Sequence, residues 1–420
     1  MFLKSSKSTV NVKVGETFQI VLSTVAVSGA TSDYDLDKNE LEVEFTSSDP
    51  SVATVSGTGL ITGLRRGNAT ISAVSKSKDL RCSVICNVQR VGALYDLSAK
   101  WDNDMAFFCS HLGGGTDAQC FDVDSKGNVW HAVTKLRGEV GHLTIIKSAP
   151  DGTILGEMQL YYASHGQSFS IEEAEDGDYI WIENCGSVNS DGRGYGTATI
   201  GSRIKFEPGG SKVPEDLASS SFCISGKSGV DVSIDRITGN VAYCYLESNN
   251  YYVKIFTKKS ILTAPFKEVS LKVTRGSSLK GQITDGKSTT VKMTLHELSD
   301  VSPLYSFSVA KSSVLGKTSA GKTMRNQGFC YYDGLCYFVS DSDGALRDAC
   351  VSSVKLDGAV SQRPTHIAAI DDAAALYACG FGVSSGYFEA EGIQFIDDKL
   401  HTGYLCWDNG LCNNAILRLH

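Results

Sequence analysis

Alternation of apolar and polar residues dominates the first 95 residues of the chain. Val10, Val12 and Val14 alternate with polar residues, and the pattern resumes from Phe18 after a Gly-Glu turn. Further alternating runs are LEVEF, ATV, LITGL, ATISAV and LRCSVICNV. A period of two is the pattern of half-buried strands. About seven short strands in one small segment predict an immunoglobulin-like β-sandwich.

From about residue 96 the pattern remains that of strands but repeats on a longer period. Five segments share one plan: a polar approach leads into an apolar strand, a tight turn and a second strand with an aromatic residue. They begin at Asp117, His165, Ser228, Asn326 and Glu391, and a further strand follows each. Repeats of about 50 residues with several strands each are typical of propeller blades.

We therefore expect an all-β chain with two domains. Residues 1–95 are predicted to form the Ig-like β-sandwich, and residues 96–420 a five-bladed β-propeller. The interval of residues 275–320 is longer than the others and holds either extra strands or an insertion. Only DDAAALYACG, near residue 375, has a helical pattern.

The bulk composition excludes several classes of protein. A chain of 420 residues exceeds one ordinary core, and 42 glycines against 7 prolines suit hairpins better than disorder. The net charge of −8 argues against a nucleic-acid partner. No apolar run has the length of a membrane span, and the opening MFLKSSKSTVNV lacks the apolar core of a signal peptide. We expect neither membrane insertion nor export by a signal peptide.

Thirteen cysteines raise the question of disulfides. Cys82 and Cys86 lie on one predicted strand, about 13 Å apart, whereas a disulfide needs Cα atoms within about 7 Å. The odd total also leaves at least one free thiol. These features predict a chain that is assembled in a reducing compartment and needs no structural disulfide.

Two sequence patterns invite a metal-site interpretation. CYYDGLC and CWDNGLC separate their cysteines by five residues, whereas zinc sites use about two to four. In a two-residue hairpin, residue 331 faces 336 and residue 407 faces 412, so the cysteines miss each other by one position. DVDSKGN resembles the start of a calcium loop, but Lys126 occupies a ligand position, which favours a plain hairpin turn. We expect neither a metal nor another cofactor.

The first domain also carries a family resemblance. VKVGETFQI, SSDPSVATVSGTGLITGLRRGNATISAV and CSVICNV resemble the bacterial Ig-like domain of group 2 in order and spacing. Such domains are usually spacers or weak binding modules on adhesins, intimins and phage virion proteins. The resemblance implies a structural spacer here.

The second domain resembles another family over residues 110–210. GHLTIIKSAPDGTILGEMQLYYASHGQSFSIEEAEDGDYIWIE and SRIKFEPG, with MRNQGFCYYDGLCYF later, carry the resemblance. They are similar to the β-propeller shared by receptor-binding proteins of P68-like staphylococcal phages, a teichoic-acid-associated family and helveticin-type bacteriocins. A His-Gly-x-Ser corner and a strand ending in Trp-Ile-Glu follow there in this order. The resemblance implies recognition of a cell wall or surface glycan and no established hydrolytic chemistry.

In a propeller, the links that lead into the five repeated segments lie on one rim. The polar residues of these links are Asp117, Gln119, His165, Gln167, Ser228, Asn326, Gln327 and Glu391. Amides, carboxylates and an imidazole around a shallow funnel suit the hydroxyls of a sugar, which makes them candidate receptor-binding residues. Alternatively, they satisfy backbone groups where blades meet. Tyr161 and Tyr162, just before the second link, either stack on a sugar face or pack between blades.

Signatures of enzymes are weak in this sequence. It has no nucleophile elbow, no His-Glu-x-x-His and no phosphate-binding Gly loop in its proper context. Acidic pairs such as Glu172–Glu173 fit a solvated hairpin turn better than a glycosidase pair. We expect no catalytic residues and a binding protein instead of an enzyme.

Together these features favour a bacteriophage tail fibre or receptor-binding protein. Such a protein is assembled in the host cytoplasm, is carried on the virion tail and recognises a host cell-surface glycan or cell-wall polymer. Its expected partners are that receptor, other virion tail proteins and copies of itself, with a trimer favoured. The alternatives are a helveticin-like bacteriocin, a bacterial surface adhesin and, from another class, a glycan-cleaving enzyme.

Overall fold

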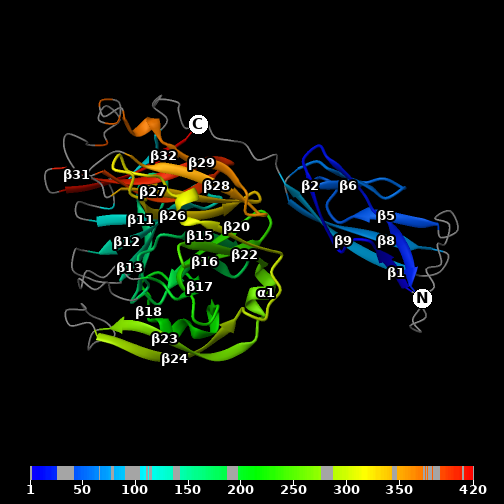
Figure 1. Ribbon diagram of the computed structural model, residues 1–420, viewed down its shortest axis with the longest axis horizontal. Helices are drawn as coiled ribbons and strands as arrows, with labels where there is room; N and C mark the ends of the chain where they lie inside the picture. The colour runs from blue at the N-terminus through cyan, green and yellow to red at the C-terminus, as the bar shows by residue number, and fades with distance from the viewer. Residues whose placement is uncertain are drawn as a thin grey trace. The chain divides into compact units, whose positions relative to one another are not determined.

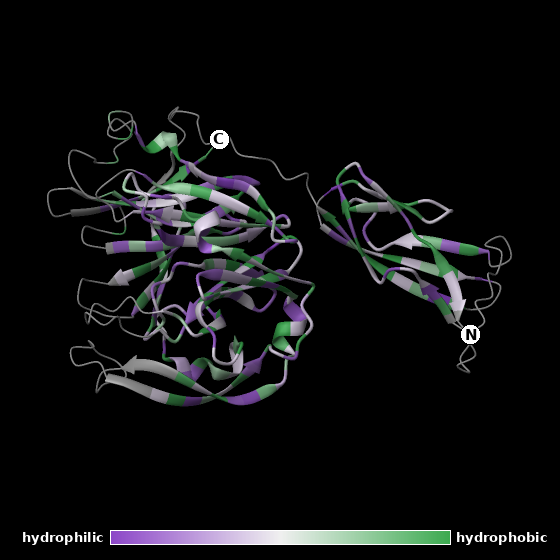
Figure 2. Ribbon diagram, viewed as in Figure 1, coloured by the Kyte–Doolittle hydropathy of each residue, from purple (hydrophilic) through white to green (hydrophobic). Residues whose placement is uncertain are grey.

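The computed structural model contains two compact units, Met1–Ala93 and Leu94–His420 (Figure 1). It describes residues 2–25, 42–65, 67–76, 80–89, 105–109, 112, 116–135, 142–186, 197–275, 287–342, 348–371, 374, 376, 381, 388–408 and 411–419. The domain boundary expected after residue 95 falls outside these ranges. Strands dominate both units, and apolar and polar bands alternate along them (Figure 2). The chain is all-β, as predicted.

The first unit is a β-sandwich. One sheet has the order β2 (Thr9–Lys13), β9 (Leu80–Gln89), β8 (Gly67–Ser75) and β5 (Val43–Ser47). Another has the order β3 (Thr17–Gln19), β7 (Leu60–Gly63) and β6 (Ala53–Val55), while β1 (Phe2–Ser5) pairs with β4 (Leu22–Val25). Val12, Ile61 and Ile71, from three of these strands, lie in one shared core. The predicted Ig-like sandwich is confirmed.

Within the described residues, the second unit contains five mainly antiparallel sheets. The first sheet has the order β11 (Thr116–Val123), β12 (Val129–Lys135), β13 (Leu143–Ser148), β14 (Ile154–Leu160) and β18 (Ser211–Lys212). The second has the order β15 (Phe169–Ala174), β16 (Gly177–Asn184), β17 (Ile200–Lys205), β19 (Ser221–Cys223), β24 (Lys287–Glu297) and β23 (Phe266–Arg275).

The remaining three sheets have four strands each. The third has the order β20 (Ser228–Asp235), β21 (Asn240–Glu247), β22 (Asn250–Thr257) and β25 (Tyr305–Ala310). The fourth has the order β26 (Arg325–Tyr332), β27 (Leu335–Asp341), β28 (Cys350–Lys355) and β29 (Val360–His366). The fifth has the order β30 (Phe388–Ile396), β31 (Lys399–Asp408), β32 (Leu411–Arg418) and β10 (Met105–Phe108). The helical elements are short: α1 (Lys258–Leu262), α2 (Lys311–Val314), η3 (Pro214–Ser220) and η4 (Ala368–Asp371).

Each repeated segment of the sequence forms a hairpin at one end of a sheet. The hairpins are β11–β12, β15–β16, β20–β21, β26–β27 and β30–β31. The two turns that carry cysteines have the predicted register, because Tyr331 faces Cys336 and Trp407 faces Cys412. The long interval holds extra strands: β23 and β24 extend the second sheet, and β25 completes the third. The helical pattern near residue 375 lies largely outside the described residues.

The five sheets follow one another around a common axis. Strands β11, β15, β20, β26 and β30, here called the central strands, each stand at one end of their sheet. Each central strand contacts the next in this order, and β30 contacts β11. The beginning and end of the unit are tied together, because β10 pairs with β32. The arrangement of the central strands is therefore cyclic.

A hydrogen bond of the same kind connects each pair of neighbouring sheets. One backbone N–H of every central strand donates to a buried polar side chain of the preceding sheet. The five bonds are Ala118 to Asn414 Oδ1 (3.1 Å), Ile171 to Asp122 Oδ2 (2.7 Å), Val232 to Ser168 Oγ (2.8 Å), Tyr331 to Ser233 Oγ (3.0 Å) and Ala390 to Asp341 Oδ2 (3.0 Å). We call these five contacts the seam bonds. They complete the cycle from the fifth sheet back to the first.

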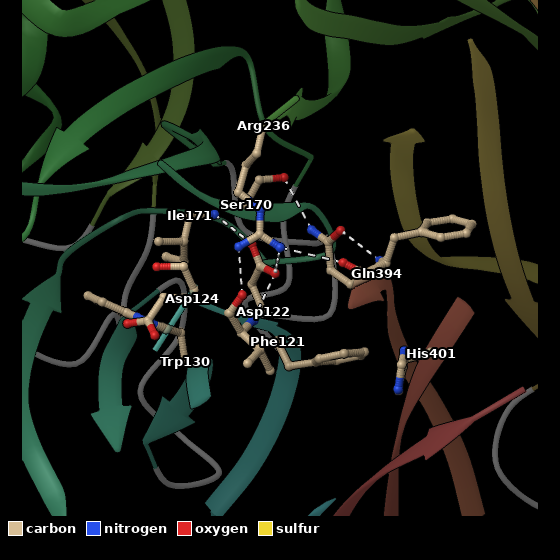
Figure 3. Close-up of polar contacts among 12 residues, drawn as sticks. Phe121, Asp122, Asp124, Trp130, Ser170, Ile171, Arg236, Gln394 and His401 are labelled. Carbon is tan, nitrogen blue, oxygen red and sulfur yellow. Dashed lines mark hydrogen bonds and ion pairs between the residues drawn. The ribbon is translucent and has the colours of Figure 1, made fainter. Parts of the chain in front are cut away.

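Polar side chains also cross the axis between sheets that are not neighbours (Figure 3). Gln394 Nε2 of β30 donates to Ser170 Oγ (3.2 Å) and to the carbonyl of Phe169, both on β15. Arg236, just after β20, donates from Nη1 to the carbonyl of Val123 on β11 (2.6 Å) and from Nη2 to that of Phe395 on β30 (3.4 Å). Arg236 therefore bridges the axis where the central strands end, whereas Gln394 reaches the first residues of β15.

The cysteines whose side chains the structure describes are all free thiols. Burial raises the pKa of Cys109 to about 12 and that of Cys86 to about 11. Since the thiolate is the reactive form, these groups are unreactive while the chain is folded.

We expect no disulfide to contribute to stability. Alkylation in denaturant without reductant should modify all thirteen cysteines, as intact mass will show, and reductant should leave the melting temperature unchanged. A native disulfide is worth about 2–5 kcal/mol. A mass that lacks two or more modifications, or a melting temperature many degrees lower in reductant, would contradict this prediction.

Candidate functional site

The central strands begin at one end of the axis, here called the entrance. Contacts among their first residues establish this arrangement. Gln167, just before β15, donates from Nε2 to the carbonyl of Asn326 on β26 (2.6 Å). Asn326 Nδ2 lies 3.4 Å from Asp231 Oδ2 on β20, and Gln327 Nε2 donates to Glu389 Oε1 on β30 (2.6 Å). The Gln167–Asn326 bond joins the second and fourth sheets, so it crosses the axis.

β-Bulges interrupt four of the five central strands at the entrance. The register shifts lie between Ala118 and Cys120, Ser228 and Asp231, Asn326 and Gly328, and Ala390 and Ile393. A bulge leaves a residue unpaired and changes where its side chain points. Gln119, Gln327 and Glu391 are such bulge residues, and all three side chains are buried. These three polar residues, predicted for the rim, are thus turned into the protein.

The link into the second sheet makes a sharp corner that a buried carboxylate holds. Glu183, at the end of β16, is only 2% exposed. Its Oε1 accepts the backbone N–H of Gln167 (2.6 Å), and its Oε2 accepts the N–H (3.0 Å) and the hydroxyl (2.7 Å) of Ser168. Gly166 within the corner has φ +84°, a conformation that favours glycine. These bonds join the His-Gly-x-Ser corner to the strand that ends in Trp-Ile-Glu.

Burial disfavours the charged form of several ionisable groups at the entrance. Burial, and then repulsion from Glu389, Asp341 and Asp117, raise the pKa of Glu391 well above its ordinary value. Burial, and then the neighbouring Glu183, raise the pKa of Asp231 well above its ordinary value. For His165 the direction is opposite: burial, and then Arg325, lower its pKa to about 4. Burial thus leaves the His165 imidazole neutral at neutral pH and disfavours the charged forms of Glu391 and Asp231.

The structure brings most of the predicted site residues together. Gln167, Asn326 and Gln327 share the hydrogen-bonded network, and Glu391 lies close enough to Asp117 for their charges to interact. His165 likewise lies close enough to Arg325 for their charges to interact. Gln119 is 3% exposed at its bulge. Asp117, His165, Gln167 and Asn326 are partly exposed, which leaves them at the surface of the entrance.

Three predicted residues stand apart from this network. Tyr162 is 2% exposed, and its ring lies edge-on against His142 with centroids 5.2 Å apart. It therefore packs inside the protein, which is the second of the two roles that the sequence left open for it. Tyr161 is partly exposed. Its ring also lies edge-on against that of His142, with the ring centroids 4.8 Å apart. Ser228 is exposed at the start of β20, where it pairs with Leu246.

Several residues of the entrance escaped prediction from sequence. Glu183 and Asp231 sit within apolar strand patterns and give no local sign that they meet. Arg325 immediately precedes Asn326 and Glu389 lies two residues before Glu391, and that proximity is the one signal in the sequence. Asp341 ends a strand, where an acidic residue is ordinarily solvated.

The structure gives no support for a metal site. No cluster of three or more His, Cys, Asp or Glu residues suited to a metal occurs in the described part of the chain. In the former calcium candidate, both carboxylate oxygens of Asp124 accept hydrogen bonds, from the N–H groups of Lys126 and Asn128 and from the side chains of Asn128 and Trp130. The hairpin-turn interpretation is confirmed. Among the described residues, no helix is long and apolar enough to span a membrane.

Comparison with known proteins identifies the first unit. Residues 5–84 match the family model of the bacterial Ig-like domain (group 2). The N-terminal unit is therefore a bacterial Ig-like domain of this group, as its sequence predicted. No curated protein matches the chain.

Solved structures give only distant likenesses. The chain is similar to a quinonprotein alcohol dehydrogenase-like protein from Bacteroides thetaiotaomicron, at 12% identity over 96% of this chain and 90% of that one, with a TM-score of 0.27. The polysaccharide lyase Uly1 follows at 8% identity, 72% and 90% coverage and a TM-score of 0.30. The Dos1 propeller has 10% identity, 86% and 80% coverage and a TM-score of 0.27. TM-scores of this size do not establish a shared fold, and no activity follows from them.

The buried carboxyls predict opposite pH effects for two matched substitutions. Glu391 has a raised pKa in the folded state, so the stability that its proton provides is complete below pH 4.5 and is lost as the pH rises. Glu391→Gln should therefore gain stability relative to the natural protein between pH 4.5 and 8, by about 1.4 kcal/mol for each pH unit over which Glu391 stays protonated. Urea unfolding at several pH values measures this.

Glu172→Gln is the matched control with the opposite sign. Burial favours a raised pKa at Glu172, but hydrogen bonds from Arg203, Lys258 and Trp181 outweigh it and lower the pKa to about 2. Its contribution is complete above pH 4.5 and is lost as the pH falls toward 2. Glu172→Gln should therefore be less stable than the natural protein above pH 4.5, and this difference in the free energy of unfolding should shrink at acid pH. Equal pH dependence in the two variants would contradict the assigned environments.

Proposed function

We propose that Leu94–His420 is a five-bladed β-propeller whose entrance binds a glycan or cell-wall polymer of a bacterial surface. In this proposal each of the five sheets is a blade. The cyclic contacts of the central strands support it, as do the seam bonds and the pairing of β10 with β32. Joining the first strand to the last sheet is one way to close such a ring without leaving a free edge.

The observation that carries the binding proposal is the chemistry of the entrance. Partly exposed amide, imidazole and carboxyl groups from different sheets converge there, and burial keeps His165 neutral. Neutral groups of these kinds both donate and accept hydrogen bonds, as sugar hydroxyls do. Their convergence suits a ligand with several hydroxyls, because each bond that replaces one to water contributes only about 1 kcal/mol.

We further propose that the chain is a receptor-binding protein of a bacteriophage virion. An Ig-like domain of group 2 beside a unit that resembles phage receptor-binding propellers supports this setting. The Ig-like domain then acts as a spacer. Weak single sites would attach firmly when several copies act together, which suits a trimeric fibre joined to other tail proteins.

Replacement of entrance residues tests the binding face. His165→Ala and Arg325→Ala should each reduce binding of the pure protein to isolated Gram-positive cell walls about fivefold, as expected for one lost hydrogen bond. Their melting temperatures should change little, because both side chains keep some exposure. Binding is measured by co-sedimentation with walls of several species, staphylococci included.

Matched controls lie at the opposite end of the axis. Lys126 and Asp176 are exposed in the turns that follow β11 and β15, so Lys126→Ala and Asp176→Ala should bind normally. Loss of binding in these two variants but not at the entrance would place the site on the other face. Absence of wall binding by the natural protein would defeat the proposal, and release of soluble sugar would favour a glycan-cleaving enzyme. Detection of the chain in purified phage particles tests the virion setting separately.

A further inference from the structure

We infer that Glu183 is the positioning residue of the entrance: it fixes the backbone corner that carries His165 and Gln167 and so controls ligand binding without touching the ligand. The inference rests on the proposed function, since it assigns a role within the same site. It concerns a residue that is buried and lies on a different strand from the side chains it positions.

The geometry of the corner shows how one carboxylate can hold it. Two successive backbone N–H groups, of Gln167 and Ser168, point to the two oxygens of Glu183 at 2.6 and 3.0 Å. The hydroxyl of Ser168 adds a third bond at 2.7 Å. The three bonds therefore fix both the position and the orientation of the backbone in the corner.

The corner needs such support because its backbone is unfavourable. Ser164 has φ +89° and Tyr162 has φ +58°, values that residues with a side chain rarely adopt. Each costs of order 1–3 kcal/mol and persists only where surrounding contacts impose it. Glu183 supplies contacts on the far side of the corner, next to the residues that reach the entrance. Without them the segment from Ser164 to Gln167 has lower-energy alternatives.

The positioned corner is connected to the rest of the entrance. Gln167 Nε2 crosses the axis to the carbonyl of Asn326, whose own amide reaches Asp231. Asp231 in turn lies near enough to Glu183 for the two carboxyls to interact. Ser168 Oγ, oriented by its bond to Glu183, accepts the seam bond from Val232 N–H (2.8 Å). A shift of the corner would thus displace groups on three sheets.

Glu183→Gln tests the role with little change in volume. Glutamine has one acceptor oxygen and one NH₂ group, so it cannot accept both backbone N–H groups. Binding to the cell walls that the natural protein binds should fall about tenfold, which is the effect of about 1.4 kcal/mol. Hydrogen exchange of the amides of residues 165–168 should accelerate. Both measurements are made well below the melting temperature of the variant.

Glu172→Gln is the matched control for general loss of stability. Glu172 is a buried carboxylate on the same sheet, near the opposite end, where it accepts bonds from Arg203, Lys258 and Trp181. It should cost comparable stability yet leave wall binding and exchange at residues 165–168 unchanged. If Glu183→Gln does not fold, Ser168→Ala removes one of the three bonds, together with the acceptor of the seam bond from Val232, and should weaken binding a few-fold.

The outcomes separate this inference from the proposed function. Failure of the natural protein to bind walls defeats the proposed function. Normal binding by Glu183→Gln, alongside weak binding by His165→Ala, overturns the positioning role and leaves the function standing. Equal loss of binding in Glu172→Gln and Glu183→Gln also overturns it, because the effect would then be one of stability alone.

Discussion

The second unit depends on how its central strands satisfy their inner edges. Each central strand has one strand partner, and its other edge is not paired with a strand of its sheet. A buried N–H without a partner costs about 1–3 kcal/mol, so these edges need acceptors that no sixth strand supplies. The five seam bonds provide them from Asn414, Asp122, Ser168, Ser233 and Asp341. Each acceptor belongs to the preceding sheet, so satisfying the edges also joins the sheets.

The entrance is a consequence of the same requirement. Bulges interrupt the ladders where four of the five central strands begin, and they turn Gln119, Gln327 and Glu391 into the protein. Gln167 lies before β15, the central strand without a bulge, and there its backbone is held by Glu183 while its side chain crosses the axis to Asn326. The sequence left open whether the rim residues satisfy backbone groups or contact a ligand. The structure assigns the first role to Gln167 and leaves His165 and Asp117 partly exposed for the second.

Local patterns in the sequence were sufficient to predict the strands and the registers of their turns. Alternation gave the Ig-like sandwich, and the two-residue turns gave the pairing of Tyr331 with Cys336, because both depend on neighbours in the chain. The seam bonds join residues that are far apart in the sequence, such as Ser233 with Tyr331 and Asn414 with Ala118. Such pairs produce no periodic pattern along the chain. Glu183 was missed for this reason. The two roles considered for Tyr162 could not be told apart, because an aromatic residue before a polar link has the same pattern whether it packs or stacks.

The seam bonds allow the closed ring to be tested directly by amide hydrogen exchange. The amides of Ala118, Ile171, Val232, Tyr331 and Ala390 represent the five seams, one each. If all five seams are closed, these amides should exchange equally slowly, at the rate set by unfolding of the whole unit. One seam amide that exchanges orders of magnitude faster than the other four would show that the ring is open at that seam and would contradict the account.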